Sequence, residues 1–130
     1  MKEAYVTYEQ SQALKRLGFS EETTHYYVNF KSDGEIKLWS RNPPDNHNAR
    51  LSINEVCSSP RLDQAQKWLR EVNGIHVEPR LQYGTIFKVV VQSETRFLYK
   101  TFENGYNSYE SALSAGIDAA LKFLTDKLNK

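Results

Sequence analysis

Cysteine, proline and glycine are scarce in this chain of 130 residues, and it has no long apolar run. Its one cysteine, Cys57, has no partner for an internal disulfide, which excludes a disulfide-rich secreted scaffold and favours a reducing compartment. No stretch approaches the roughly 18 apolar residues of a membrane span, and no signal-peptide pattern follows Met1. We therefore expect a cytoplasmic protein with no membrane partner.

An excess of charge of one sign is also missing. The formal net charge is +1, and neither half of the chain is a basic arm. No whole-molecule field is available to hold a polyanion, so nucleic acid stays open as a partner but is disfavoured by charge.

Aromatic residues, by contrast, are plentiful. Eight Tyr, six Phe and two Trp within 39% hydrophobic residues are typical of a folded chain. The length predicts a single domain over 1–130. We expect this domain to be α+β, with an N-terminal helix, hairpin and loop in 1–56 and the main core in 57–130.

The C-terminal half carries the clearest pattern. Helical periodicity over about 60–73 and 109–128 flanks three strand-like runs, at 75–81, 85–92 and 96–102. The order α-β-β-β-α predicts a three-stranded antiparallel sheet with both helices on one face. Trp68 and Val72 fall on the apolar stripe of the first helix, Asn107 with Glu110 caps the second, and Gly116 inside it indicates close approach to the sheet.

The N-terminal half predicts a helix and a hairpin. Thr7 with Gln10 forms a capping-box pattern, and Gly18 supplies a left-handed helix end. Alternating residues over 25–31 and 35–40 predict two strands around a turn at 32–34. With this turn, Tyr27 and Trp39 are expected to point outward. The residues expected to share the buried face are Tyr26, Val28, Phe30, Ile36 and Leu38. The hairpin either packs on the C-terminal unit or extends its sheet, and 41–49 is expected to be a polar surface loop.

Three segments in order, 5–19, 66–77 and 105–112, carry a family resemblance. They read YVTYEQ with LKRLGF, QKWLREVNGIHV, and GYNSYESA. With these segments the chain resembles a family of small uncharacterised proteins from bacteriophage, prophage and mobile-element sequences of gut bacteria. The resemblance implies that setting and no biochemical activity.

In topology alone, 60–128 is also similar to double-stranded-RNA-binding domains. Those domains place lysines at the start of the last helix to contact phosphates. This chain has no Lys or Arg between Thr101 and Leu121, and Glu110 occupies the first turn, so the fold analogy does not bring the binding function with it.

No motif predicts catalysis, a metal or a cofactor. His25, His47, His76 and Cys57 are metal-ligand types without informative spacing, and the Asp45–Asn48 segment lacks the second histidine of a nuclease-type site. We therefore expect no enzyme and no bound cofactor.

The aromatic residues give the remaining hypothesis. Exposed aromatic side chains concentrate at interaction surfaces, which makes Tyr27, Trp39 and Tyr83 the candidate binding residues. We expect a non-catalytic protein-interaction module with an unknown protein partner, or alternatively a nucleic-acid binder on the double-stranded-RNA-binding scaffold.

Overall fold

The computed structural model describes residues 4–30, 34–49, 55–93, 97–100 and 105–128. These form two compact units, one of Tyr5–Arg61 and one from Leu62 onward together with Ala4. Each unit combines helix with an antiparallel sheet, so the chain is α+β, as predicted. The two sheets are separate, with strand orders β2-β1-β3 and β4-β5-β6, and the hairpin therefore does not extend the C-terminal sheet. The expectation of one domain over 1–130 stays a prediction, because two sheets can belong to one domain or to two.

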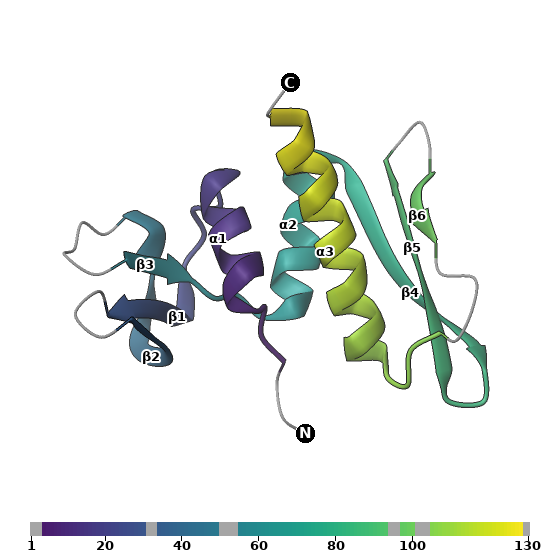
Figure 1. Cartoon of the computed structure of the whole chain (residues 1–130), viewed down its shortest axis with the longest axis horizontal. Helices are drawn as coiled ribbons and strands as arrows, with labels where there is room; N and C mark the ends of the chain where they lie inside the picture. Colours follow the sequence, from purple (N-terminus) through teal and green to yellow (C-terminus); the bar gives the residue numbers. More distant parts are fainter. Residues whose placement is uncertain (1–3, 31–33, 50–54, 94–96, 101–104, 129–130) are drawn as a thin grey trace. The chain divides into compact units, whose positions relative to one another are not determined.

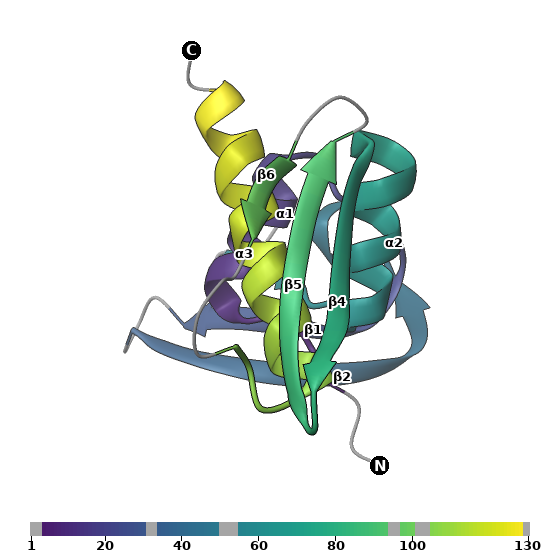
Figure 2. The same cartoon turned by 90° about the vertical axis from the view of Figure 1, so that its right-hand side faces the viewer.

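The C-terminal unit has the predicted α-β-β-β-α order. It contains α2 (Leu62–Asn73), β4 (Ile75–Tyr83), β5 (Ile86–Ser93), β6 (Phe97–Lys100) and α3 (Tyr109–Leu128). Both helices contact β4 and each other. They lie on the same side of the sheet, behind β4 and β5 where Figure 2 views it face-on (Figures 1 and 2). The predicted arrangement of both helices on one face of the sheet is confirmed. None of the described helices is long and apolar enough to cross a membrane.

The core of this unit lies between the helices and the sheet. Trp68 is 4% exposed on α2, and Gln66 Nε2 donates to the Val77 carbonyl at 2.6 Å, which ties α2 to β4. A Cβ built on Gly116 of α3 would lie 2.5 Å from Val77 Cγ1 and 2.6 Å from Val89 Cγ2. Gly116 therefore allows α3 to approach the sheet closely, as its position in the sequence predicts.

Two details of these helices differ from the prediction. Val72 is 63% exposed, so it lies outside the buried stripe of α2. The cap of α3 is formed by Ser108 in place of Asn107, because Ser108 Oγ accepts from the Ser111 backbone N–H at 3.1 Å. Either residue type suits an N-cap, and the sequence alone does not distinguish adjacent candidates.

The N-terminal unit contains α1 (Tyr8–Arg16), β1 (Thr23–Phe30), β2 (Glu35–Asp45), the short 3₁₀ helix η1 (His47–Ala49) and β3 (Glu55–Ser58). The capping box is confirmed, since Gln10 N–H donates to Thr7 Oγ1 at 3.2 Å and Thr7 N–H donates to Gln10 Oε1 at 2.8 Å. Gly18 follows α1 with φ of +93°, the left-handed conformation expected of it. Strand β1 is central in the sheet, with β2 and β3 at its edges.

The segment predicted as a polar loop is largely ordered structure. Strand β2 continues to Asp45, which pairs with Thr23, and η1 follows directly. Strand β3, which the sequence did not indicate as part of this sheet, places Cys57 in the N-terminal unit rather than in the C-terminal core.

Gly116 gives the first testable prediction. Gly116→Ala should lower the free energy of unfolding by about 1–3 kcal/mol, because the new methyl group overpacks the contact with Val77 and Val89. Helix propensity alone predicts the opposite sign, a gain of about 1 kcal/mol. Urea denaturation measures the change. Lys122→Ala, at an exposed position of the same helix, is the control and should stay within about 0.5 kcal/mol of wild type. A Gly116→Ala protein as stable as wild type, or more stable, would contradict the close approach.

Candidate functional site

The aromatic side chains of the β1–β2 hairpin form the most distinctive surface of the N-terminal unit. Strand pairing places Tyr26 opposite Trp39 and Phe30 opposite Glu35. Trp39 packs edge-on to Tyr26, with ring centroids 6.4 Å apart, and tilted against Phe30 at 5.6 Å. Lys37 Nζ lies 6.0 Å from the centroid of the Phe30 ring. We call this set, Tyr26, Phe30, Lys37 and Trp39, the aromatic face.

The register of the hairpin differs by one residue from the predicted one. The predicted turn at 32–34 would pair Phe30 with Ile36 and Val28 with Leu38, whereas Phe30 pairs with Glu35 and Val28 with Lys37. Because side chains alternate along a strand, a one-residue slip moves every β2 side chain to the other face. The predicted faces are therefore wrong: Trp39 shares a face with Tyr26, and Leu38 shares one with Tyr27.

Tyr27 lies on the face of β1 opposite to Trp39 and is held by the N-terminal segment. Its hydroxyl donates to the Val6 carbonyl at 2.9 Å, and the Tyr8 ring packs edge-on to it with centroids 5.6 Å apart. Burial raises the pKa of the Tyr27 hydroxyl above its ordinary value, although a hydrogen bond with Ser59 acts in the other direction. These contacts give Tyr27 a packing role within the unit, in place of the outward position predicted for it.

His47 and Asn48, which follow β2, contact segments of the N-terminal unit that are distant in sequence. His47 is fully buried, stacks on Tyr26 with centroids 4.2 Å apart, and lies 2.9 Å through Nε2 from the Thr23 carbonyl. Asn48 Nδ2 donates to the Phe19 carbonyl, and Asn48 Oδ1 accepts from the Ser58 N–H, each at 2.8 Å. Sequence analysis did not predict the packing role of either residue, because polar composition predicts a solvated turn and no local signal shows that their partners lie in distant segments.

The remaining candidate residue, Tyr83, belongs to the C-terminal unit. It lies at the end of β4 and is 67% exposed, just before the positive-φ Gly84 of the β4–β5 turn. Tyr83 therefore belongs to a different unit from Tyr27 and the aromatic face.

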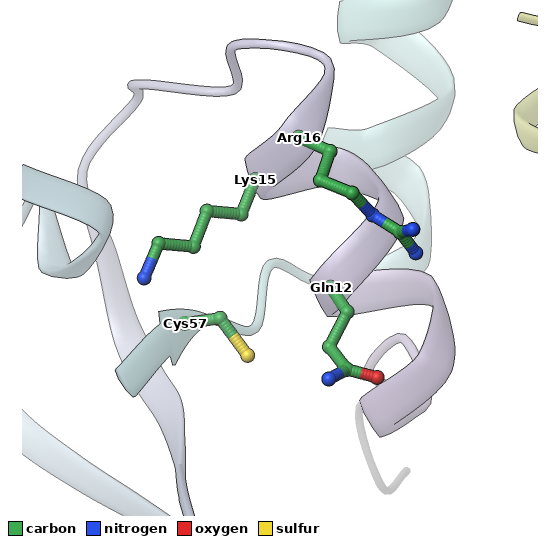
Figure 3. Close-up of a pocket in the computed structure, with 4 residues that line it drawn as sticks. All are labelled: Gln12, Lys15, Arg16 and Cys57. Carbon is green, nitrogen blue, oxygen red and sulfur yellow. The ribbon is translucent and has the colours of Figure 1, made fainter. Parts of the chain in front are cut away.

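A cavity of about 680 Å³ lies between α1 and β3, lined by Gln12, Lys15, Arg16 and Cys57 (Figure 3). The Lys15 side chain extends over β3, and its Nζ donates to the Val56 carbonyl at 2.7 Å, while the Cys57 thiol points toward Gln12. A thiol acts as a nucleophile when a histidine or carboxylate accepts its proton. Neither type is among the described residues that line the cavity, which gives no basis for assigning a reaction.

The potential metal ligands do not assemble in the described part of the chain. The His25 ring lies tilted against the Tyr5 ring with centroids 4.0 Å apart, and His76 lies on β4 of the other unit. Across the described residues there is no group of three or more His, Cys, Asp or Glu side chains placed to hold a metal ion.

Comparisons with known proteins give no relative on which to base a function. No family model, no curated protein and no solved structure matches this chain.

The hydroxyl of Tyr27 gives the second prediction. Tyr27→Phe should lower the free energy of unfolding by about 1 kcal/mol at neutral pH, through loss of the bond to the Val6 carbonyl. Folding favours the protonated hydroxyl, so in the wild type this contribution is complete below the unfolded-state pKa. It is lost as pH rises above about 10, through the raised folded-state pKa.

The difference between Tyr27→Phe and wild type should therefore shrink between about pH 8 and about pH 10.5, as measured by urea denaturation at each pH. Tyr83→Phe, which changes an exposed side chain, is the control and should match wild type at neutral pH. Equal stability of Tyr27→Phe and wild type at both values of pH would show that the hydroxyl has no structural role.

Proposed function

We propose that this chain is a non-catalytic protein-interaction module that binds its partner through the aromatic face of the hairpin. The observation that carries the proposal is the state of Trp39. Its side chain is 46% exposed, yet the ring is held against both Tyr26 and Phe30.

An exposed tryptophan held in this way suits recognition for two physical reasons. It offers a large apolar area whose removal from water favours association, and its conformational freedom is already restricted by neighbouring rings. Binding hot spots are enriched in tryptophan for the same reasons. The partner that fits is a protein surface with an apolar pocket for the indole.

Lys37 adds specificity at the border of this apolar contact. Its ammonium lies beside the Phe30 ring and 3.7 Å from Glu35 Oε1, with about half of each charged side chain exposed. Charges at the rim of an interface affect the association rate and the choice of partner more than the affinity. The resemblance of three sequence segments to phage and mobile-element proteins supports a partner inside a bacterial host.

Nucleic-acid binding on the C-terminal unit is the second candidate, and its α-β-β-β-α topology is the observation in its favour. The charges favour it less. Glu110 occupies the first turn of α3, where phosphate contacts would be made, and Lys122 and Lys127 lie farther along the helix. We therefore rank it below protein interaction.

Trp39→Ala gives the third prediction. The variant should remain folded but lose at least about tenfold in affinity for a partner captured from bacterial lysate by the wild type, because the indole is the proposed anchor. Val72→Ala, which truncates an exposed apolar residue on α2, is the control and should keep the partner. Tyr83→Ala, measured in parallel, shows whether the C-terminal unit contributes. Circular dichroism confirms folding, and mass spectrometry identifies the captured protein.

The proposal is wrong if Trp39→Ala captures the same protein with the same affinity, or if the wild type captures none. Binding of labelled duplex RNA at low salt, with affinity falling steeply as salt rises, would favour the second candidate instead. No shift of duplex RNA or DNA at low salt would remove it.

A further inference from the structure

We infer that the outer edge of β2 pairs with the same edge of a second copy of this chain, antiparallel and about a two-fold axis at Leu38. The inference goes beyond the proposed function, because it is argued first from the backbone edge of β2 and is tested without the partner of the aromatic face.

The first step is to determine which backbone groups β2 presents outward. His25 accepts from the Ser59 N–H, so alternate residues of β1 beginning with His25 bond toward β3. Their neighbours, Tyr26, Val28 and Phe30, therefore bond toward β2, where they pair with Trp39, Lys37 and Glu35. This alternation leaves the N–H and C=O groups of Ile36, Leu38 and Ser40 pointing away from the sheet.

The two edges of this sheet differ in whether side chains cover their backbone groups. On β3, the outward carbonyl of Val56 accepts from Lys15 Nζ and the outward N–H of Ser58 donates to Asn48 Oδ1, so side chains cover that edge. On β2, every residue from Glu35 to Asp45 is exposed, and no further strand of the described residues lies beside it. An exposed edge of this kind is a template for pairing with another strand.

The apolar content of β2 makes such pairing favourable. Ile36 and Leu38 are each 43% exposed on one face, and Trp39 is 46% exposed on the other. Pro43 and Pro44 lack an N–H donor and restrict a ladder to the segment before them, so the pairing segment is Glu35–Arg41.

The charges of this segment favour a second copy in one register. With Leu38 opposite Leu38, the outward groups of Ile36 meet those of Ser40, and Glu35 faces Arg41 of the second copy at both ends. Lys37 then lies beside Trp39 of the second copy, an arrangement that favours a cation–π contact.

The neighbouring registers that keep the same hydrogen-bonding groups are worse. A shift toward the turn places Lys37 opposite Lys37, and a shift the other way places Lys37 opposite Arg41. A further shift brings Pro44 into the ladder. Like charges directly opposite each other are destabilising, and a proline removes a ladder bond. The segment is therefore self-complementary in the Leu38-centred register.

Charge variants test the energetics, and they give the fourth prediction. Purified wild type should pass from monomer to dimer in sedimentation equilibrium between about 1 µM and about 1 mM, a weak dimer consistent with a small interface. Glu35→Arg creates Arg–Arg pairs and Arg41→Glu creates Glu–Glu pairs, so each variant alone should raise the dimer Kd by about tenfold or more. An equimolar mixture of the two should form a heterodimer, and the double variant should recover wild-type dimerisation.

Cysteine variants test the register. Leu38→Cys should form a disulfide-linked dimer under mild oxidation, since Cα atoms of a hydrogen-bonded antiparallel pair lie about 5.5 Å apart, within disulfide range. Ile36→Cys and Ser40→Cys should each fail to link to themselves but should link to each other. Wild type, whose Cys57 is 1% exposed, is the negative control.

A wild type that stays monomeric up to about 1 mM would overturn the inference, as would single charge variants that dimerise like wild type or a self-link at residue 36 in preference to 38. These measurements use the purified protein alone. A monomer would therefore reject the second copy while the binding of a foreign partner by Trp39 is tested separately by capture.

Discussion

The pairing of Phe30 with Glu35 is the constraint on which the N-terminal unit and its proposed surface depend. This single register decides that Trp39 lies beside Tyr26 and Phe30, that Tyr27 faces the N-terminal segment, and that Leu38 presents its backbone outward. Because side chains alternate, there is no intermediate arrangement between this register and the neighbouring one. A buried polar residue far from the turn packs on β1: His47 stacks on Tyr26 and lies 2.9 Å through Nε2 from the Thr23 carbonyl.

Much of the C-terminal unit could be predicted from its residues, whereas the hairpin register could not. Helix α3 spans the predicted residues because its apolar pattern repeats over many residues and its ends carry a cap and a charge pattern. The glycine at 116 marks its contact with the sheet. The hairpin offers weaker information, since apolar residues occur on both faces of β2 and their alternation therefore does not favour one register over the other. The regular structure of 41–49 could not be predicted, because it depends on partners such as Thr23 that are distant in sequence.

The candidate site reflects the same division. Trp39 was found from its residue type and its place on a strand, and the structure adds the two rings that hold it. Tyr27 has the same residue-level features but is held by Val6 and Tyr8, so side-chain type alone did not separate a proposed contact residue from a packing residue. Lys15 and Asn48 bond to the outward backbone groups of β3, whereas β2 is exposed. The sheet therefore has one closed edge and one open edge. The open edge and the aromatic face lie on the same hairpin, so pairing of two copies would join two aromatic faces in a continuous sheet.

The register itself is tested most directly by cross-strand nuclear Overhauser effects in dilute solution. Non-hydrogen-bonded antiparallel pairs bring their Cα atoms to about 4.5 Å, which gives strong contacts between their α-protons. The structure predicts these contacts between Tyr27 and Leu38 and between Asn29 and Ile36. Strong α-proton contacts from Tyr27 to Trp39, or from Asn29 to Lys37, would place β2 in the neighbouring register and contradict the account of both the aromatic face and the open edge.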